Sequence, residues 1–148
     1  MSRTRIAQIM LAVVAASALV ACGASAAEPQ TDAPTHPAET LNPLFSEQLP
    51  NVPGKTFTSA IVAFPPAARA VPHRHGDAFV YAYVLEGAVS SEIEGQPPHV
   101  YRQGENWSEE PGAHHLATEN TSATQEAKLL VVFVATTGQE LKVDDPHG

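Results

Sequence analysis

The sequence is poor in cysteine and in basic side chains, and both shortages narrow the classes of protein to which it can belong. One of its 148 residues is a cysteine, so no disulfide can form within the chain. Eight lysines and arginines stand against 16 acidic residues, which gives a formal net charge of −8 at pH 7. No basic stripe is present to contact phosphates, and this argues against nucleic-acid binding.

Several enzyme motifs are also missing. The chain has no G-x-S-x-G, no P-loop and no dinucleotide-binding fingerprint, which argues against a serine hydrolase or a nucleotide enzyme. The apolar run at residues 6–21 is too short for a comfortable permanent transmembrane helix. What the chain does have is 43% hydrophobic residues, enough for the core of one small domain.

The N-terminus has the pattern of a secretory signal: Arg3 and Arg5 precede the apolar run, and small residues follow it. The tetrapeptide LVAC, which ends at Cys22, resembles a bacterial lipobox. This resemblance implies that residues 1–21 are removed and that Cys22 is lipidated. We therefore expect an exported, membrane-anchored lipoprotein of the cell envelope, on the periplasmic side if the source is Gram-negative. The alternatives are ordinary cleavage after the ASA at 24–26, which discards Cys22, and a single transmembrane anchor.

Composition divides the remaining chain into three parts. Residues 22–54 are rich in proline, alanine and small polar residues without a sustained period, which predicts a spacer and an N-terminal arm. Residues 55–137 contain short runs of β-branched and aromatic residues separated by glycine and proline, which predicts an antiparallel β-barrel or sandwich. Residues 138–148 form a polar C-terminal tail.

Three of the seven histidines stand out by their spacing. His73 and His75 are two residues apart, and on a strand this spacing places both side chains on one face. His115 lies further along the chain, and a barrel interior can bring it to the same ion. Neutral imidazoles suit Zn, Cu, Fe and Ni. The His-x-His pair alone is a weak indication of a metal, because many such pairs are surface or hydrogen-bonded core histidines.

The segments around these histidines resemble the two motifs of the cupin superfamily, G(X)5HXH(X)3–4E(X)6G and G(X)5PXG(X)2H(X)3N. HRHGDAFVYAYVLEG supplies His73, His75 and Gly87 at matching spacing, and GENWSEEPGAHHLATEN supplies two glycines and His115. The resemblance implies an all-β fold: a small antiparallel β-barrel of the double-stranded β-helix, jelly-roll-like type. It also implies a divalent metal inside the barrel and, often, a dimer.

The chain departs from the first motif at one position that changes its chemistry. Val80 stands where the family carries its glutamate, and a valine cannot bind a metal. We therefore predict a site of three histidines, with Val80 as an apolar pocket wall beside the ion and with coordination positions left open. In the second motif, Glu110 stands in place of the proline, and Asn120 comes one position late. The alternative is a degenerate barrel that binds an organic ligand without metal.

Other polar and aromatic residues near the motifs fit a metal site less well. His114 neighbours a predicted ligand, so on a strand it points to the opposite face and is expected to be exposed. Asp77 lies in a predicted bend and fits the motif poorly. Trp107 is expected in the core or the pocket wall. Tyr81 and Tyr83 are expected to pack on the side away from the metal or at a dimer contact.

The resemblance leads to one main hypothesis on function. It is a metal-dependent dioxygenase that acts on a small chelating organic molecule, with Fe, Mn, Ni, Cu or Zn as the metal and with no catalytic side chain assigned. The alternatives are a non-enzymatic module of the cell envelope that binds a small ligand or metal, and a metal-dependent isomerase or lyase. The expected partners are a small molecule and a second copy of the chain, with no nucleic acid and with membrane contact by the lipid anchor alone. Because one fold hosts many chemistries, family membership does not choose among these functions.

Overall fold

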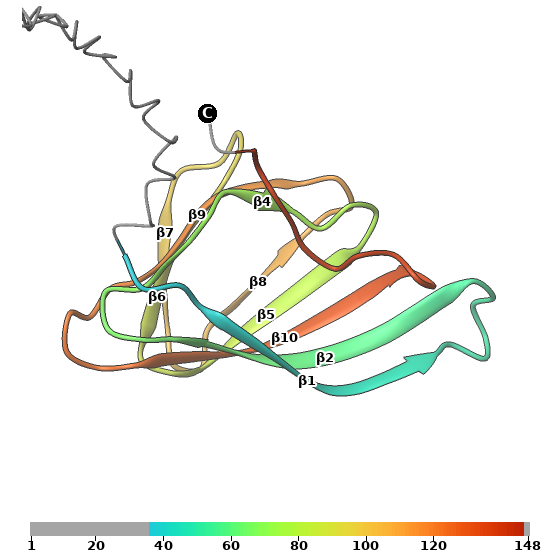
Figure 1. Ribbon diagram of the computed structural model, residues 1–148, viewed down its shortest axis with the longest axis horizontal. Coiled ribbons are helices and arrows are strands. Elements are labelled where there is room, and N and C mark those ends of the chain that lie inside the picture. The colour runs from blue at the N-terminus through green and yellow to red at the C-terminus, as the bar shows by residue number, and fades with distance from the viewer. Residues whose placement is uncertain (1–35, 147–148) are drawn as a thin grey trace, which may run out of the picture. The chain divides into compact units, whose positions relative to one another are not determined.

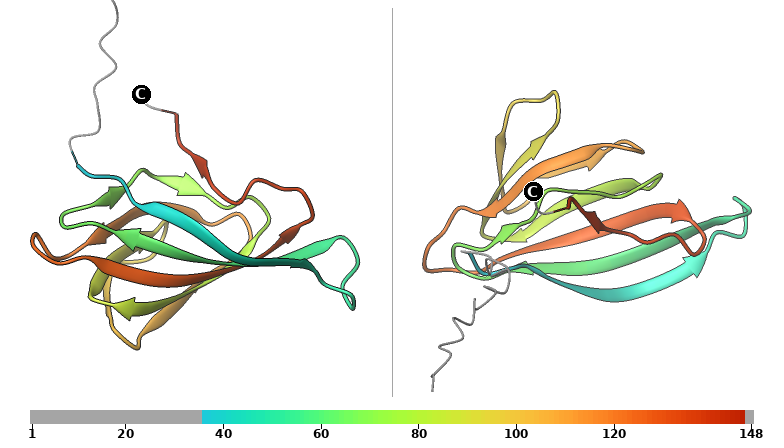
Figure 2. Two further views of the ribbon diagram at one scale, coloured as in Figure 1. Left: turned by 60° about the horizontal axis from the view of Figure 1, so that its bottom comes forward. Right: turned by 45° about the horizontal axis from the view of Figure 1, so that its top comes forward.

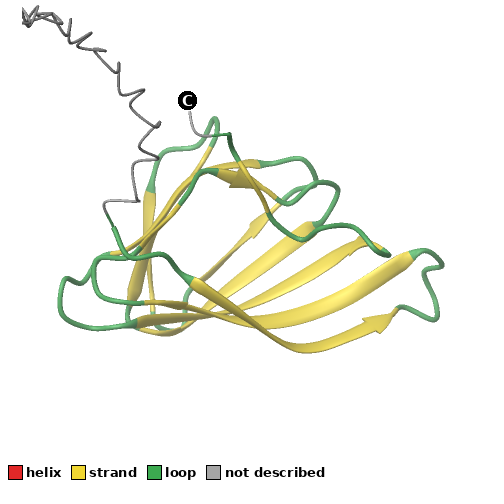
Figure 3. Cartoon of the chain, in the orientation of Figure 1, coloured by secondary structure: helices red, strands yellow, loops and turns green. Residues whose placement is uncertain are grey.

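The computed structural model describes residues 36–146, which contain eleven strands and no helix (Figure 3). No helix in this part of the chain is therefore long and apolar enough to cross a membrane. The predicted leader and Cys22 lie outside the described residues. The strands are β1 (Thr40–Gln48), β2 (Lys55–Phe64), β3 (Arg69–Ala70), β4 (His73–Arg74), β5 (Phe79–Glu86), β6 (Ala88–Ile93), β7 (His99–Arg102), β8 (Asn106–Glu109), β9 (His114–Asn120), β10 (Ala127–Thr136) and β11 (Val143–Asp144).

The strands form two antiparallel sheets (Figure 1). The five-stranded sheet has the order β1-β2-β10-β5-β8, and the six-stranded sheet has the order β11-β4-β9-β6-β7, with β3 beside β9. Within residues 36–146 every strand pair belongs to one sheet or the other, so the sheets face each other without closing into one hydrogen-bonded barrel (Figure 2). This arrangement confirms the predicted all-β fold of the jelly-roll-like type.

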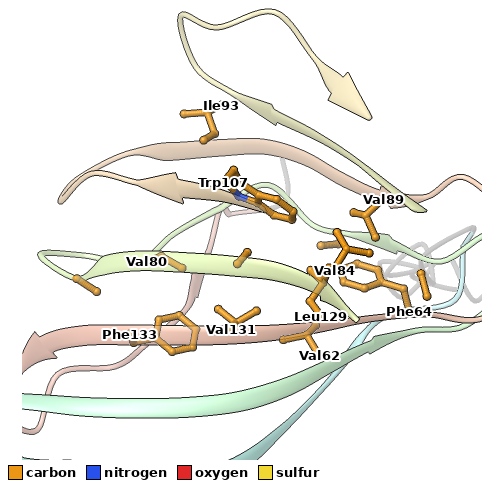
Figure 4. Close-up of a cluster of buried hydrophobic side chains, with 14 of the residues drawn as sticks. Val62, Phe64, Val80, Val84, Val89, Ile93, Trp107, Leu129, Val131 and Phe133 are labelled. Atoms are coloured by element: carbon orange, nitrogen blue, oxygen red, sulfur yellow. The ribbon is translucent and has the colours of Figure 1, made fainter. Parts of the chain in front are cut away.

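The core lies between the sheets, where alternate residues of each strand point inward. Along β2 and β10 buried residues alternate with half-buried ones, which is the period of 2 that a sheet with one covered face imposes. The apolar run of β10 is nearly continuous, which is typical of a strand buried on both faces, but Leu130 and Val132 on its outer face are only half-buried. The labelled side chains in Figure 4 point into one apolar cluster: Val62, Phe64, Val80, Val84, Val89, Ile93, Trp107, Leu129, Val131 and Phe133.

Two segments outside 55–137 also belong to the sheets. The predicted N-terminal arm includes β1, which pairs with β2 along its length. All nine residues of β1 are exposed, and its register shifts between Pro43 and Phe45. A proline has no N–H to donate, so it is tolerated on an edge strand or at a bulge. The predicted polar tail includes β11, whose Asp144 lies opposite His73 on β4. The tail therefore reaches the strand that carries His73.

Candidate metal centre

Three buried histidines lie together between the sheets. His73 and His115 are directly opposite each other on β4 and β9, and His75 follows β4. The ring centroid of His73 lies 4.8 Å from that of His75 and 5.0 Å from that of His115. Each of the three residues offers a ring nitrogen, and these nitrogens lie within 4.8 Å of one another. The structure thus brings together all three histidines that the motif spacing selected.

Hydrogen bonds to the backbone fix two of the rings. His73 Nδ1 lies 2.7 Å from the carbonyl oxygen of Val71, and His75 Nδ1 donates to the carbonyl oxygen of Leu141. When Nδ1 donates, the neutral ring keeps its lone pair on Nε2, which is then free to bind a metal. Partners of this kind are typical of metal-binding histidines, because they set both the tautomer and the ring orientation.

In His115 the hydrogen-bonded ring nitrogen is Nε2 instead of Nδ1. Its Nε2 lies 2.9 Å from the hydroxyl of Ser91 and 2.8 Å from the hydroxyl of Thr118. Its Nδ1 is buried and makes no hydrogen bond of standard geometry, although Oε1 of Glu109 lies 3.1 Å from it. The nitrogen that His115 has available for a metal is therefore Nδ1, whereas His73 and His75 offer Nε2.

Burial keeps the first two histidines neutral. It lowers the pKa of His73 to about 4, against the opposing effect of the Val71 carbonyl and with smaller contributions from His75, His115 and Lys142. Burial also lowers the pKa of His75, although the charge of Glu109 raises it. Neutral imidazole is the form that binds metals, so the surroundings favour the binding form over a wide range of pH.

One carboxylate, which sequence analysis did not single out, lies against these rings. Glu109 on β8 is 3% exposed, with Oε1 3.1 Å from His115 Nδ1 and Oε2 3.7 Å from His75 Nε2. The indole Nε1 of Trp107 donates to Oε1 over 3.1 Å. Burial raises the pKa of Glu109, but the contact with His115, the charge of His75 and the Trp107 hydrogen bond together hold that pKa below its ordinary value.

A cavity of about 150 Å³ adjoins the four side chains. Its remaining walls are mostly apolar, and Val80 is among them at 1% exposure. Trp107 also lines the cavity, as the sequence analysis expected of a core or pocket-wall aromatic. The other apolar lining residues are Leu41, Val62, Phe64, Ala70, Ala82, Leu129, Val131 and Phe133.

Two segments distant in sequence meet at the edge of this cavity. Glu39, just before β1, and Lys142, just before β11, both line the cavity, and their side chains form an ion pair of 2.7 Å. Asp144 lies 2.6 Å from the same ammonium group. Burial lowers the pKa of Lys142, but these two carboxylates outweigh it and hold the pKa above its ordinary value.

The structure places the remaining candidates away from the ring nitrogens that face the cavity. His114 is partly buried rather than exposed, and its Nε2 lies 2.7 Å from Asp145. Asp77 is exposed and paired with Lys55 over 2.8 Å. Tyr81 and Tyr83 alternate with the buried residues of β5, so they point away from the cavity as expected.

Glu109 was missed although the sequence contained a signal for it. Sequence analysis predicted short strands between glycine and proline turns in this part of the chain, and the structure has β8 at Asn106–Glu109. Residues two apart on a strand share a face, so a pocket-wall role for Trp107 already placed Glu109 on the cavity side. The Leu141 carbonyl that holds His75 belongs to the backbone, and no residue type in the sequence marks such a contact.

The chain matches one protein-family model and resembles several solved structures. A family model described as "Cupin domain" matches residues 60–133. No curated protein matches the sequence. A solved conserved protein from Klebsiella pneumoniae with a double-stranded β-helix domain is similar at a TM-score of 0.58 and 12% identity, over 78% of this chain and 90% of its own.

Two further solved structures are similar at a TM-score of 0.52. The protein TT1209 of Thermus thermophilus is 25% identical, over 65% of this chain and 82% of its own. The DMSP lyase DddQ of Ruegeria pomeroyi is 22% identical, over 59% of this chain and 42% of its own. This chain therefore spans less than half of the lyase, and the likeness to it concerns the fold.

Proposed function

This chain belongs to the cupin family, and we propose that it binds one divalent transition metal through His73, His75 and His115 and acts as a metal-dependent oxygenase on a small chelating molecule. The observation that carries the proposal is the cluster of three buried imidazoles whose ring nitrogens lie within 4.8 Å of one another beside a cavity. The donor set fits the metal, because neutral imidazoles suit Fe, Ni, Cu and Zn. The buried His115 Nδ1, which makes no hydrogen bond of standard geometry, fits it too.

The size of the cavity limits the substrate. An apolar cavity of about 150 Å³ holds a molecule about the size of benzene, and this volume is what adjoins the histidines here. A catechol, a β-diketone or a small thiol is of this size, whereas a flavonol is too large to enter without rearrangement.

The chain contributes positioning and exclusion of water. A bound divalent metal supplies Lewis acidity and, for a redox-active ion, a site for dioxygen chemistry. Val71, Leu141, Ser91 and Thr118 hold the three rings, so little reorganisation is needed on binding. Val80 and the other apolar walls exclude water and lower the local dielectric, which strengthens electrostatic interactions with a polar substrate.

A module that binds without turnover is the second candidate. In its favour, the cavity walls within residues 36–146 are mostly apolar. Their ionisable side chains are the three histidines, Glu109 and the Glu39–Lys142 pair at the edge. A lyase or isomerase that uses the metal only as a Lewis acid is the third candidate, and a solved neighbour of similar fold is a DMSP lyase.

Two measurements test the proposal. Metal analysis of the full chain purified without added metal is expected to find about one transition-metal ion per chain. Dioxygen uptake is then followed over catechols, β-diketones and thiols. Substrate-dependent uptake supports the oxygenase, and ligand binding without uptake selects the module. The His73→Ala/His75→Ala/His115→Ala variant should lose the metal, while the matched control His99→Ala, at an exposed histidine outside the cavity, should keep it. Full metal content in the triple variant would overturn the site.

We also propose that the protein is exported and anchored through a lipidated Cys22, which the LVAC segment supports. Labelled fatty acid should enter the wild-type protein and not the Cys22→Ala variant, which should also lose membrane retention. Absence of label from the wild-type protein would refute the lipid anchor.

A homodimer is the proposed assembly, and the outer face of β5 supports it. Phe79 and Leu85 there are each 38% exposed, and Tyr81 and Tyr83 lie between them. Sedimentation of the wild-type protein should give the mass of two chains, and a monomer at micromolar concentration would refute the assembly.

A further inference from the structure

Glu109 differs from every other acidic residue in the described part of the chain. Among residues 36–146 it is the only carboxylate side chain that is buried. A buried charge is costly unless it is paired or binds a metal. Its hydrogen-bond donor is the Trp107 indole, which satisfies Oε1, while Oε2 is buried without a hydrogen-bond partner. The site therefore contains an anionic oxygen atom whose bonding capacity is unused.

The sheet register relates Glu109 to the missing motif glutamate. Glu109 on β8 is directly opposite Val80 on β5. Directly opposed residues in an antiparallel pair project to the same face of the sheet. Both side chains line the same cavity. The cavity therefore receives no carboxylate from position 80, but it receives one from Glu109 on the neighbouring strand.

Glu109 lies close to two ring nitrogens that face the same space. Ligand atoms at about 2.1 Å from a metal, with angles between 90° and 109° at that metal, lie about 3.0–3.4 Å apart. Glu109 Oε1 lies 3.1 Å from His115 Nδ1, within this range, and Oε2 lies 3.7 Å from His75 Nε2, slightly beyond it. These two nitrogens are the ones that the ring hydrogen bonds leave available. Hydrogen bonding of Glu109 to His115 alone would leave Oε2 unsatisfied, whereas a cation between the groups satisfies both.

We propose that Glu109 is the fourth ligand of the metal, so that β8 supplies the carboxylate that the family motif places on β5. The centre then has three imidazoles and one carboxylate. A six-coordinate ion keeps two open positions, which suits a substrate that binds through two oxygen atoms. This inference rests on the proposed function, because it takes the three-histidine centre as its starting point.

Titration of the full chain with Zn²⁺ and Co²⁺ tests the proposal. Glu109→Gln keeps the size of the side chain and removes its charge, and it should weaken metal binding more than 100-fold. The matched control is Glu110→Gln, the same change at the adjacent, exposed residue, which should bind Zn²⁺ as the wild type does. Equal Zn²⁺ affinity in Glu109→Gln and wild type would overturn the proposal.

A rescue variant distinguishes two roles for Glu109: direct binding of the metal and positioning of His115. The distinction is needed because loss of a hydrogen-bond partner of a metal ligand also lowers metal affinity by about 10- to 100-fold. Val80→Glu/Glu109→Gln returns a carboxylate to the family position and should recover most of the Zn²⁺ affinity lost in Glu109→Gln. A double variant that binds as weakly as the single variant would count against ligation by Glu109.

Infrared difference spectra with and without Zn²⁺ can be recorded on the wild type alone, so this test does not depend on the folding of a variant. A metal-bound carboxylate shifts its stretching bands, and this shift should be present in the wild type. If one equivalent of Zn²⁺ binds with no carboxylate shift, Glu109 is not a ligand and the three-histidine centre stands alone. If the wild type takes up no Zn²⁺ or Co²⁺, the proposed function fails, and this inference fails with it.

Discussion

The five-stranded sheet and the six-stranded sheet face one cavity but contribute different side chains to it. The first supplies valine, leucine and phenylalanine from β2, β5 and β10, and the second supplies His73 and His115, together with Thr118. Glu109, on the edge strand β8 of the five-stranded sheet, is the exception. The contrast separates two tasks: burial of the apolar sheet stabilises the fold, while the polar sheet holds most of the groups that we propose bind the ion. Changes on the two sides should therefore affect different measurements.

The largest expected effect is on the polar sheet. His115→Ala removes a predicted ligand near the start of β9. It should lower metal affinity by more than the roughly 10- to 100-fold loss that follows removal of a hydrogen-bond partner of a metal ligand. The free energy of unfolding of the metal-free protein should change much less than the metal affinity does. Equilibrium titration with Zn²⁺ and urea unfolding in a chelator measure the two quantities. Metal affinity within error of the wild type would remove His115 from the site.

Phe64→Ala makes the opposite change, on the apolar sheet. Phe64 is 2% exposed, and truncation of a buried phenylalanine should lower the free energy of unfolding by about 3–5 kcal/mol. Zn²⁺ affinity of the folded fraction should stay close to that of the wild type, because the aromatic rings that pack on the three clustered histidines in residues 36–146 are those of Phe133 and Trp107. A large loss of affinity with little loss of stability would show that the two sheets do not divide the tasks in this way.

Acid should destabilise the metal-free protein through the polar sheet. The pKa of His73 is about 4 in the folded protein against about 6.5 for an unperturbed histidine, so the unfolded chain binds this proton first as pH falls. The contribution of neutral His73 to the free energy of unfolding is fully present above about pH 6.5. It declines by up to about 3 kcal/mol as pH falls toward 4. Urea unfolding of the chelator-treated protein at several pH values measures it. His73→Gln should flatten the dependence in this window, and an unchanged slope would contradict the assignment to His73.

The smallest expected effect is at Asp77, which belongs to neither side of the cavity. Its carboxylate is exposed and paired with Lys55, and contacts with Lys55 and Thr136 lower its pKa to about 2. Asp77→Asn should leave Zn²⁺ affinity unchanged, because the side chain does not line the cavity. A fall in affinity comparable to that of His115→Ala would reopen Asp77 as a ligand.

Much of the fold and part of the site were predictable from local patterns. Short runs of β-branched and aromatic residues between glycine and proline indicated antiparallel strands, and the spacing of His73, His75 and His115 selected the three rings that the structure brings together. Local patterns do not report register between distant strands, so the pairing of Val80 with Glu109 was out of reach. The inclusion of β1 was hidden because its residues are exposed and Pro43 breaks the alternation.

The bond between His75 and the Leu141 carbonyl has a consequence for biosynthesis. Leu141 is translated after all three histidines, and Gln139 also donates to the His75 carbonyl over 3.0 Å. A nascent chain that already contains both cupin motifs therefore still lacks the contacts that orient His75. Tight uptake of metal should follow the folding back of residues 139–145 rather than accompany translation of the motifs. The metal available to the protein is then the one present where folding finishes, so the compartment of folding contributes to metal selection.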